Sequence, residues 1–275
     1  MIALGGKSRQ SLASLRGTLD EQLKGVSSAD CTAISHDLFL VLASLNSSIG
    51  LRRAFTDPSR DAASKSALIA DLFGKSVSKS AIALLEAAVS LRWSSPVDVA
   101  SAVEQLAIES EATAANADNT LDRLQEELFA FETLLEQNTD LRGAVSINNV
   151  EAAHKSVLLS ALLGNKVAPS TLRLVTELVN ALNGRNIELV IDLYIQSVAA
   201  RRNRAIAVVR SRSELSTAQT EKLVALLTKQ MGQPVHLNVD IDPTVLGGLS
   251  IRFKDEMIDG TISTRVAEAG RALAV

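Results

Sequence analysis

The sequence has little of several residue types, and each shortage excludes a class of structure. A single cysteine, Cys31, has no partner for an intramolecular disulfide and cannot form a cysteine-based metal site, which fits a reducing compartment. The opening residues, MIALGGKSRQ, lack the apolar run of a signal peptide, and no apolar stretch approaches the roughly 20 residues that span a bilayer. We therefore expect a cytoplasmic protein that reaches membranes only through partners.

Excess positive charge is also absent. The formal net charge is -3, which argues against a nucleic-acid binder, because neutralising phosphates requires a basic excess. One local cluster departs from this balance: Arg201, Arg202, Arg204, Arg210 and Arg212. It has two interpretations, a solvated helix end favoured by the helix dipole or a docking surface for an acidic partner helix.

Motifs for nucleotide binding are incomplete. Gly6-Lys7-Ser8 and Gly74-Lys75-Ser76 imitate the end of a phosphate-binding loop, but that loop needs another glycine five residues before its Gly-Lys pair. Met1 and Ile69 occupy those places. We expect Gly74 to end a helix instead.

Patterns for metal binding or catalysis are missing as well. The histidines fall in different predicted elements, and none forms a metal-binding pair with another. They are His36, His154 and His236. Asp255-Glu256 falls where a hairpin should turn and Asp259 where a helix should begin, so turn chemistry explains these carboxylates better than acid/base work. We expect no catalytic residues, no metal and no cofactor.

What the sequence does contain is length, apolar content and a repeat. With 275 residues, 47% of them hydrophobic, it can bury a substantial core and form more than one unit. The segment from Leu51 aligns without gaps to the segment from Leu141, 90 residues later. Matching residues in the first segment are Leu51, Arg52, Ala54, Lys65, Ser66, Leu68, Leu72, Gly74, Ser80 and Leu84. The same supersecondary unit therefore occurs twice.

Helical periodicity dominates the chain before Arg204. Predicted helices cover 8–24, 29–47, 59–73, 78–93, 149–163, 170–183 and 187–201, and the segment 97–137 forms one long helix or two nearly continuous ones. We expect a helical bundle unit over 1–116 and a second over 97–203, which share the helix 97–116. The fold class is mostly α, with two related bundles followed by a small α+β domain over 204–275.

The period changes after Arg204. Ala205–Val209 and Val235–Val239 are predicted strands, and Ser216 with Gln219 forms a capping box for a helix to Met231. The stretch 242–263 combines a turn, a Gly-Gly pair, alternating strand residues and a final helix. Gly247 and Gly248 are expected to adopt positive φ or a close backbone approach, as fold-critical positions together with Asp259 and Gly260.

This C-terminal stretch resembles the signature of the delta subunit of F-type ATP synthases, the family of the mitochondrial oligomycin-sensitivity-conferring protein. The residues that carry the resemblance are Leu246-Gly247-Gly248, Ile258-Asp259-Gly260-Thr261 and a helix from about Ser263. The resemblance extends upstream to about Asn183. The sequence departs from the family pattern by having its helical unit twice, and only the second copy has the Asn183-Gly184-Arg185 step.

The resemblance implies a non-catalytic stator subunit in the peripheral stalk of a proton-translocating ATP synthase, peripheral on the cytoplasmic face of the cell membrane. Its helical region would grip N-terminal helices of the alpha subunits, held between its first and fifth helices. Its C-terminal domain would bind the b-type stalk. An unrelated helical adaptor that bridges two other proteins is the alternative, and a small-molecule enzyme comes third.

A second apolar stripe on the central helices favours such helix-in-groove recognition, although a helix that is merely central in its bundle has the same pattern. The predicted partner-binding residues are Leu12, Leu15, Leu19, Val77, Leu84, Ala88, Leu91, Leu174, Leu178 and Ala181.

Overall fold

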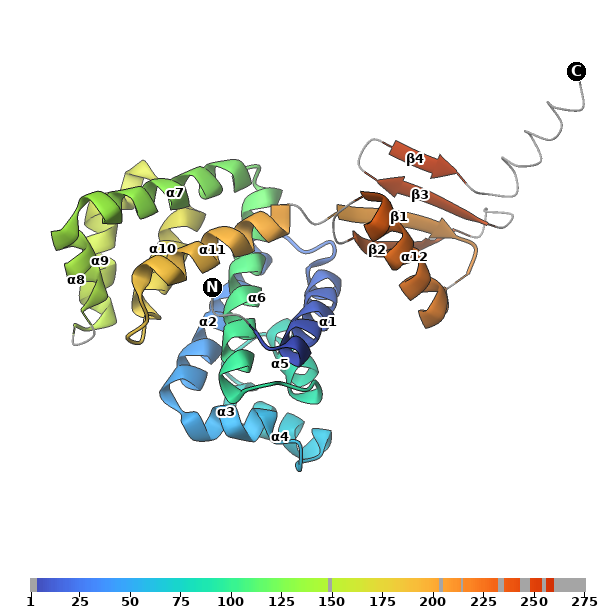
Figure 1. Cartoon of the computed structure of the whole chain (residues 1–275), viewed down its shortest axis with the longest axis horizontal. Coiled ribbons are helices and arrows are strands. Elements are labelled where there is room, and N and C mark those ends of the chain that lie inside the picture. Colours follow the sequence, from blue (N-terminus) through green and yellow to red (C-terminus); the bar gives the residue numbers. More distant parts are fainter. Residues whose placement is uncertain are drawn as a thin grey trace, which may run out of the picture. The chain divides into compact units, whose positions relative to one another are not determined.

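The computed structural model describes residues 4–147, 150–202, 205–213, 215–231, 235–242, 248–253 and 256–259. The chain separates into two compact units, Met1–Arg202 and Asn203–Val275. The first is helical throughout its described part and the second contains a β-sheet (Figure 1). The predicted fold class, mostly α with a small α+β part after it, is confirmed.

The helices of the first unit follow the periodicity of the sequence closely. They are α1 (Gly6–Leu23), α2 (Ser28–Ser47), α3 (Ile49–Thr56), α4 (Ala62–Phe73), α5 (Lys79–Ser90), α6 (Pro96–Ala117), α7 (Leu121–Gln137), α8 (Thr139–Ser146), α9 (Ala152–Leu163), α10 (Pro169–Asn180) and α11 (Ile187–Arg202). A short 3-10 helix, η1 (Gly164–Lys166), follows α9.

Local chemistry explains where these helices begin and end. The side chains of Ser27, Asp61 and Ser78 each accept the backbone N–H three residues on, which supplies a partner that the first turn of a helix lacks. Pro96 begins α6, a position where its missing N–H costs nothing. The predicted segment 97–137 is two helices, because the backbone leaves helical geometry at Asn119, whose φ is 56°.

The repeat extends to the bounds of the helices. Helices α3, α4 and α5 lie 90 positions before α8, α9 and α10, and α2 and α7 end 90 positions apart. Helices α1 and α6 begin 90 positions apart, and α6 and α11 begin 91 positions apart. Helix α6 is therefore both the last helix of the first copy and the first helix of the second.

Helix α6 packs accordingly. It contacts α1, α2 and α3 of the first copy and α7, α10 and α11 of the second. In Figure 1 it runs through the middle of the helical unit, with helices of both copies around it. One continuous hydrophobic core extends through both copies as a result.

A tertiary contact is also repeated. Asp37 of α2 accepts the backbone N–H of Ser78 at 2.7 Å, just before α5. Ninety positions on, Glu127 of α7 accepts the N–H of Ala168 at 2.8 Å, just before α10. Burial alone would raise the pKa of Glu127, but hydrogen bonds from Thr171, Ala168 and Arg123 together lower it. Each copy thus ties its second helix to the start of its fifth with a carboxylate.

The second unit is a four-stranded sheet in the order β2-β1-β3-β4 with one helix. Its elements are β1 (Ala205–Ser211), α12 (Thr217–Met231), β2 (Val235–Ile241), β3 (Leu249–Phe253) and β4 (Glu256–Asp259). Strand β1 pairs parallel with β2 through the α12 crossover and antiparallel with β3. The hydrophobic core of the second unit contains Val209, Leu227, Leu237 and Ile251.

Several details of this unit were predicted from the sequence. The capping box is confirmed, because Gln219 accepts the N–H of Ser216 at 2.9 Å and donates its own N–H to the Ser216 hydroxyl. Gly248 has φ 83°, as expected. Glu256 and Asp259 need correction, since both belong to β4, paired with Phe253 and Ser250, rather than to a turn and a helix start. Gly247, Gly260 and the predicted final helix lie outside the described residues.

Gly248 gives the first testable prediction. Replacing it with valine places a β-branched side chain at positive φ, which should destabilise the second unit by about 1–3 kcal/mol. Urea unfolding followed by amide exchange should show the loss in β1–β4 and none in α1–α11. Gly143→Val is the matched control, because a Cβ at Gly143 meets nothing within 4 Å. Equal stability of Gly248→Val and the parent would show that this position tolerates a side chain.

Candidate partner-binding surfaces

The central helix α6 contains three glutamates that have almost no contact with solvent. The side chains of Glu104, Glu109 and Glu111 are 1%, 1% and 2% exposed. A helix surrounded by two bundles has no solvent face, so its polar residues must point at neighbouring helices. Burying a carboxylate is costly unless it is paired and hydrogen-bonded.

Each of these carboxylates has an arginine partner from a different segment. Arg185, which precedes α11, bonds both oxygens of Glu104 at 2.7 and 2.8 Å. Burial alone would lower the pKa of Arg185, but the bonds to Glu104 raise it overall. Arg16 of α1 binds Glu109 at 2.6 Å, and Arg173 of α10 binds Glu111 at 2.6 and 2.9 Å. Helices of both copies are therefore fixed to α6 by charge.

A fourth ion pair joins α11 to α1. Arg201 near the end of α11 pairs with Asp20 of α1 and donates to the hydroxyl of Thr113 on α6 at 2.7 Å. Its acidic partner thus lies on another helix of the same chain. Of the other arginines in the predicted cluster, Arg210 and Arg212 are exposed in the second unit, and the side chains of Arg202 and Arg204 lie outside the description.

The predicted partner-binding residues occupy the core more than the surface. Seven are buried, among them Leu84 and Leu178: Leu12, Leu15, Leu19, Leu84, Ala88, Leu174 and Leu178. Val77, Leu91 and Ala181 are half-buried and pack against the same core. At the seven buried positions the side chains pack against neighbouring helices within the core. Whether a partner contacts the three half-buried positions stays a prediction.

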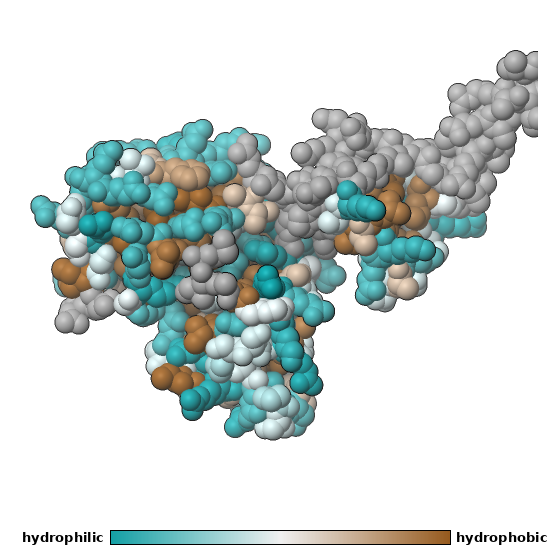
Figure 2. Space-filling view, in the orientation of Figure 1, coloured by the Kyte–Doolittle hydropathy of each residue, from teal (hydrophilic) through white to brown (hydrophobic). Residues whose placement is uncertain are grey.

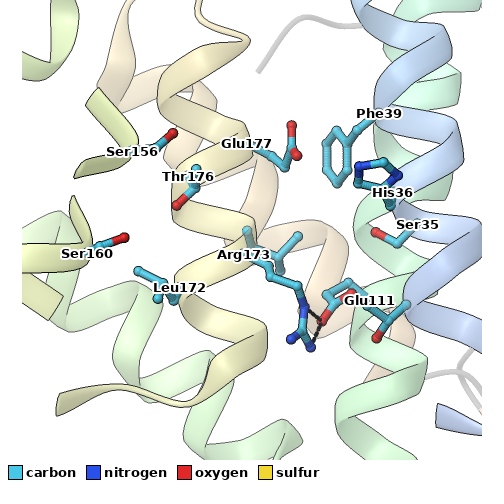
Figure 3. A pocket seen from close by; sticks show the side chains of 12 residues that line it. Ser35, His36, Phe39, Glu111, Ser156, Ser160, Leu172, Arg173, Thr176 and Glu177 are labelled. Carbon is cyan, nitrogen blue, oxygen red and sulfur yellow. Dashed lines mark hydrogen bonds and ion pairs between the residues drawn. The ribbon is translucent and has the colours of Figure 1, made fainter. Parts of the chain in front are cut away.

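A cavity of about 270 Å³ lies between the two copies (Figure 3). Ser35, His36 and Phe39 enter it from α2, and Arg173 and Glu177 from α10. The Phe39 ring stacks on Tyr194 of α11 with centroids 6.4 Å apart. Burial raises the pKa of Glu177, and the nearby His36 opposes that shift.

Ser8 and Gly74, which belong to the two incomplete phosphate-binding motifs, have structural roles. Ser8 lies at the start of α1, where its hydroxyl donates to Asp98 of α6 at 2.6 Å and accepts the N–H of Ser94 at 2.8 Å. Gly74 ends α4, as predicted, and a Cβ there would lie 2.5 Å from the Ala70 carbonyl oxygen. In the described ranges, no group of three His, Cys, Asp or Glu residues is placed to hold a metal.

No single helix in the described part of the chain is long and apolar enough to cross a membrane. One bent pair, α2 with α3, meets the length and composition requirements across a 108° bend. The apolar side chains of α2 that face inward belong to the core of the helical unit.

Sequence reasoning missed the buried ion pairs. The signal was present, because the segment EQLAIESEA places Glu104, Glu109 and Glu111 in an apolar helix on more than one face. A carboxylate on the apolar face of a predicted core helix requires a partner. The identity of the partners was not readable, since Arg16 and Arg185 are 93 and 81 residues away from theirs.

Comparison with known proteins decides the family. Residues 109–273 match the family described as ATP synthase delta (OSCP) subunit. ATP synthase subunit delta of Streptomyces coelicolor is 40% identical over 274 residues, which cover 100% of both chains. The Thermobifida fusca protein of that name is 39% identical over 98% of this chain and 99% of its own. The chain belongs to the ATP synthase delta (OSCP) subunit family.

These matches span 98% or more of this chain and 99% or more of each relative, so both helical copies lie within the matched length. A solved chain in the mitochondrial ATP synthase hexamer of Toxoplasma gondii is 17% identical and covers 61% of this chain and 97% of its own, with a TM-score of 0.27. A score that low does not establish a common overall fold. The family assignment rests on the sequence matches.

The Arg185–Glu104 pair yields the second prediction. Arg185→Met removes one partner and leaves the Glu104 carboxylate buried and unpaired, which should cost about 3–5 kcal/mol of stability. Urea unfolding of the helical unit measures the loss. Adding Glu104→Gln to Arg185→Met should recover part of the loss, because no charge then stays buried. If the double variant is less stable than Arg185→Met, the unpaired charge is not the cause.

Glu177 gives a pH prediction. Because its folded pKa is raised, its favourable contribution is full below the unfolded pKa of about 4.3 and is lost as pH rises through the folded pKa. Glu177→Gln cannot ionise, so it should melt at a higher temperature than the parent near neutral pH and show no gain near about pH 4. Glu86→Gln, on an exposed position of α5, controls for the loss of one negative charge.

Proposed function

We propose that the chain is a stator subunit of an F-type ATP synthase and has no active site of its own. It would link the catalytic F1 head to the membrane-anchored b-type stalk, so that the head does not turn with the central shaft during proton-driven ATP synthesis. It would lie on the cytoplasmic face of the cell membrane as a peripheral component. Membership of the delta (OSCP) family is the observation that carries this proposal.

The division into two units supports a linking role. Each unit has its own hydrophobic core, so each can present a surface to a different partner. We assign the helical unit to N-terminal helices of the alpha subunits and the second unit to the C-terminal end of the b-type stalk. Two linked contacts hold more tightly than either one alone, because the second binding step becomes intramolecular.

The construction of the helical unit also fits a part that resists torque. Its two copies share α6 and are fixed to it by arginine–glutamate pairs rather than by a flexible linker. Side chains that reach the surface on the predicted alpha-binding side include Val77 and Leu91, next to α5. These two residues are the accessible part of the predicted partner-binding set in the first copy.

The test is reconstitution in membrane vesicles that contain the ATP synthase. Removing the chain should release the head and abolish proton-driven ATP synthesis, while the released head still hydrolyses ATP. Adding back the full-length chain should restore synthesis and coupling. A chain with Val77→Asp and Leu91→Asp should bind the head less tightly than a chain with Ala63→Asp, which changes an exposed position of α4.

Vesicles that retain coupled synthesis without the chain would refute the stator proposal. Recovery of the chain in a different complex would favour the adaptor alternative.

A further inference from the structure

The repeat makes it possible to compare a covered helix surface with its uncovered equivalent. In the first copy, one stripe of α2 and one of α6 face the second copy. Ninety positions on, α7 and α11 have no third copy beside them. Phe39 is 5% exposed and its counterpart Phe129 is 45% exposed, while Val99 is 0% exposed and its counterpart Leu189 is 52%. The second copy therefore ends in the surface that the first copy uses to bind its neighbour.

Most positions that are apolar on this surface in the first copy are polar in the second copy, as the exposed end of a repeat array requires. Buried Leu42 becomes Glu132, buried Ala102 becomes Asp192, and buried Leu106 becomes the exposed Gln196. Terminal repeats need a polar outer face to stay soluble. That need does not explain Phe129 and Leu189, which keep large apolar side chains in solvent. We call the surface formed by Phe129, Glu132, Glu136, Leu189 and Asp192 the α7/α11 end face.

The end face is negatively charged and its charge is not balanced within the described structure. Glu132 is close enough to Glu136 and Asp192 for both to raise its pKa, after burial as the largest cause. None of the ion pairs among the described residues involves these three carboxylates. Figure 2 shows hydrophobic surface between α7 and α11 with hydrophilic surface along both helices.

We propose that the α7/α11 end face binds an amphipathic helix of another polypeptide, with apolar side chains on Phe129 and Leu189 and lysine or arginine side chains beside the carboxylates. The occupant is a helix because the equivalent surface of the first copy is covered by helices of the second, with Phe39 stacked on Tyr194. It is basic because the rim is acidic, and complementary charge selects the partner and its orientation. Phosphate-rich partners, whether nucleic acid or anionic lipid, are repelled by the same rim.

This surface is distinct from the helices α1 and α5 that the stator proposal uses, and it can be tested without an ATP synthase. The probe is a synthetic amphipathic helix of about 18 residues, five turns, with leucines along one face and lysines on both flanks. A second peptide has glutamates in place of the lysines. Binding of each fluorescently labelled peptide to the full-length chain is measured by anisotropy at low and at high salt.

The lysine peptide should bind at least about tenfold more tightly than the glutamate peptide at low salt, and high salt should reduce the difference. Phe129→Ala and Leu189→Ala should each weaken lysine-peptide binding about fivefold or more. The triple change Glu132→Gln, Glu136→Gln and Asp192→Asn should abolish the preference for lysine. Val157→Ala is the matched control, because Val157 is a similarly exposed apolar residue on α9.

Melting temperatures of all variants show whether they remain folded, as expected for exposed positions. Equal binding of the two peptides would overturn the proposal, as would undiminished binding to Phe129→Ala or weakening by Val157→Ala as large as by Phe129→Ala. Sedimentation of the chain alone gives a further check. A dimer that Phe129→Ala dissociates would mean that the face binds a second copy of this chain, which also contradicts the proposal.

Discussion

The helical unit depends on one constraint, that a single helix must serve two bundles at once. Helix α6 ends the first copy and begins the second, so no side of it is left for water over most of its length. Each of its three glutamates is hydrogen-bonded to an arginine, and Arg185, Arg16 and Arg173 come from three different segments. Such pairs add little net stability over apolar residues, but each is costly to break from one side. Their effect is to fix which helices meet and in which register.

Repetition with a shared helix has a consequence for the ends of the array. The sequence contains the inner surface twice, once in each copy, but only the surface of the first copy is covered by another copy. The last copy therefore presents the equivalent surface with no following copy to cover it. Glu132 and Asp192, the counterparts of Leu42 and Ala102, adapt that surface to solvent. Phe129 is the counterpart of a residue that is stacked on Tyr194 in the inner interface, and solvent exposure alone gives no reason to keep it aromatic.

Much of the fold followed from periodicity and punctuation. Helix bounds were close wherever a cap or a glycine marked an end, as at Gly25, Gly74 and Pro96, and the Ser216–Gln219 box placed α12. The short helices α3 and α8 were not predicted, because eight residues are too few to show a clear period. The break at Asn119 was left open, because asparagine tolerates positive φ and does not mark a helix end as glycine or proline does.

The candidate site was less predictable, because it depends on which of two apolar stripes faces outward. A helix wheel shows that Leu84 and Val89 lie on opposite sides of α5, but it does not show that neighbours cover both sides. The 90-residue repeat contained the missing information. Once α1 and α6 are recognised as equivalent, α6 must be packed on both sides, and positions that differ in polarity between copies, such as Leu42 and Glu132, mark where the packing ends. Comparing a repeat with itself therefore locates free surface more reliably than the apolar content of any one helix.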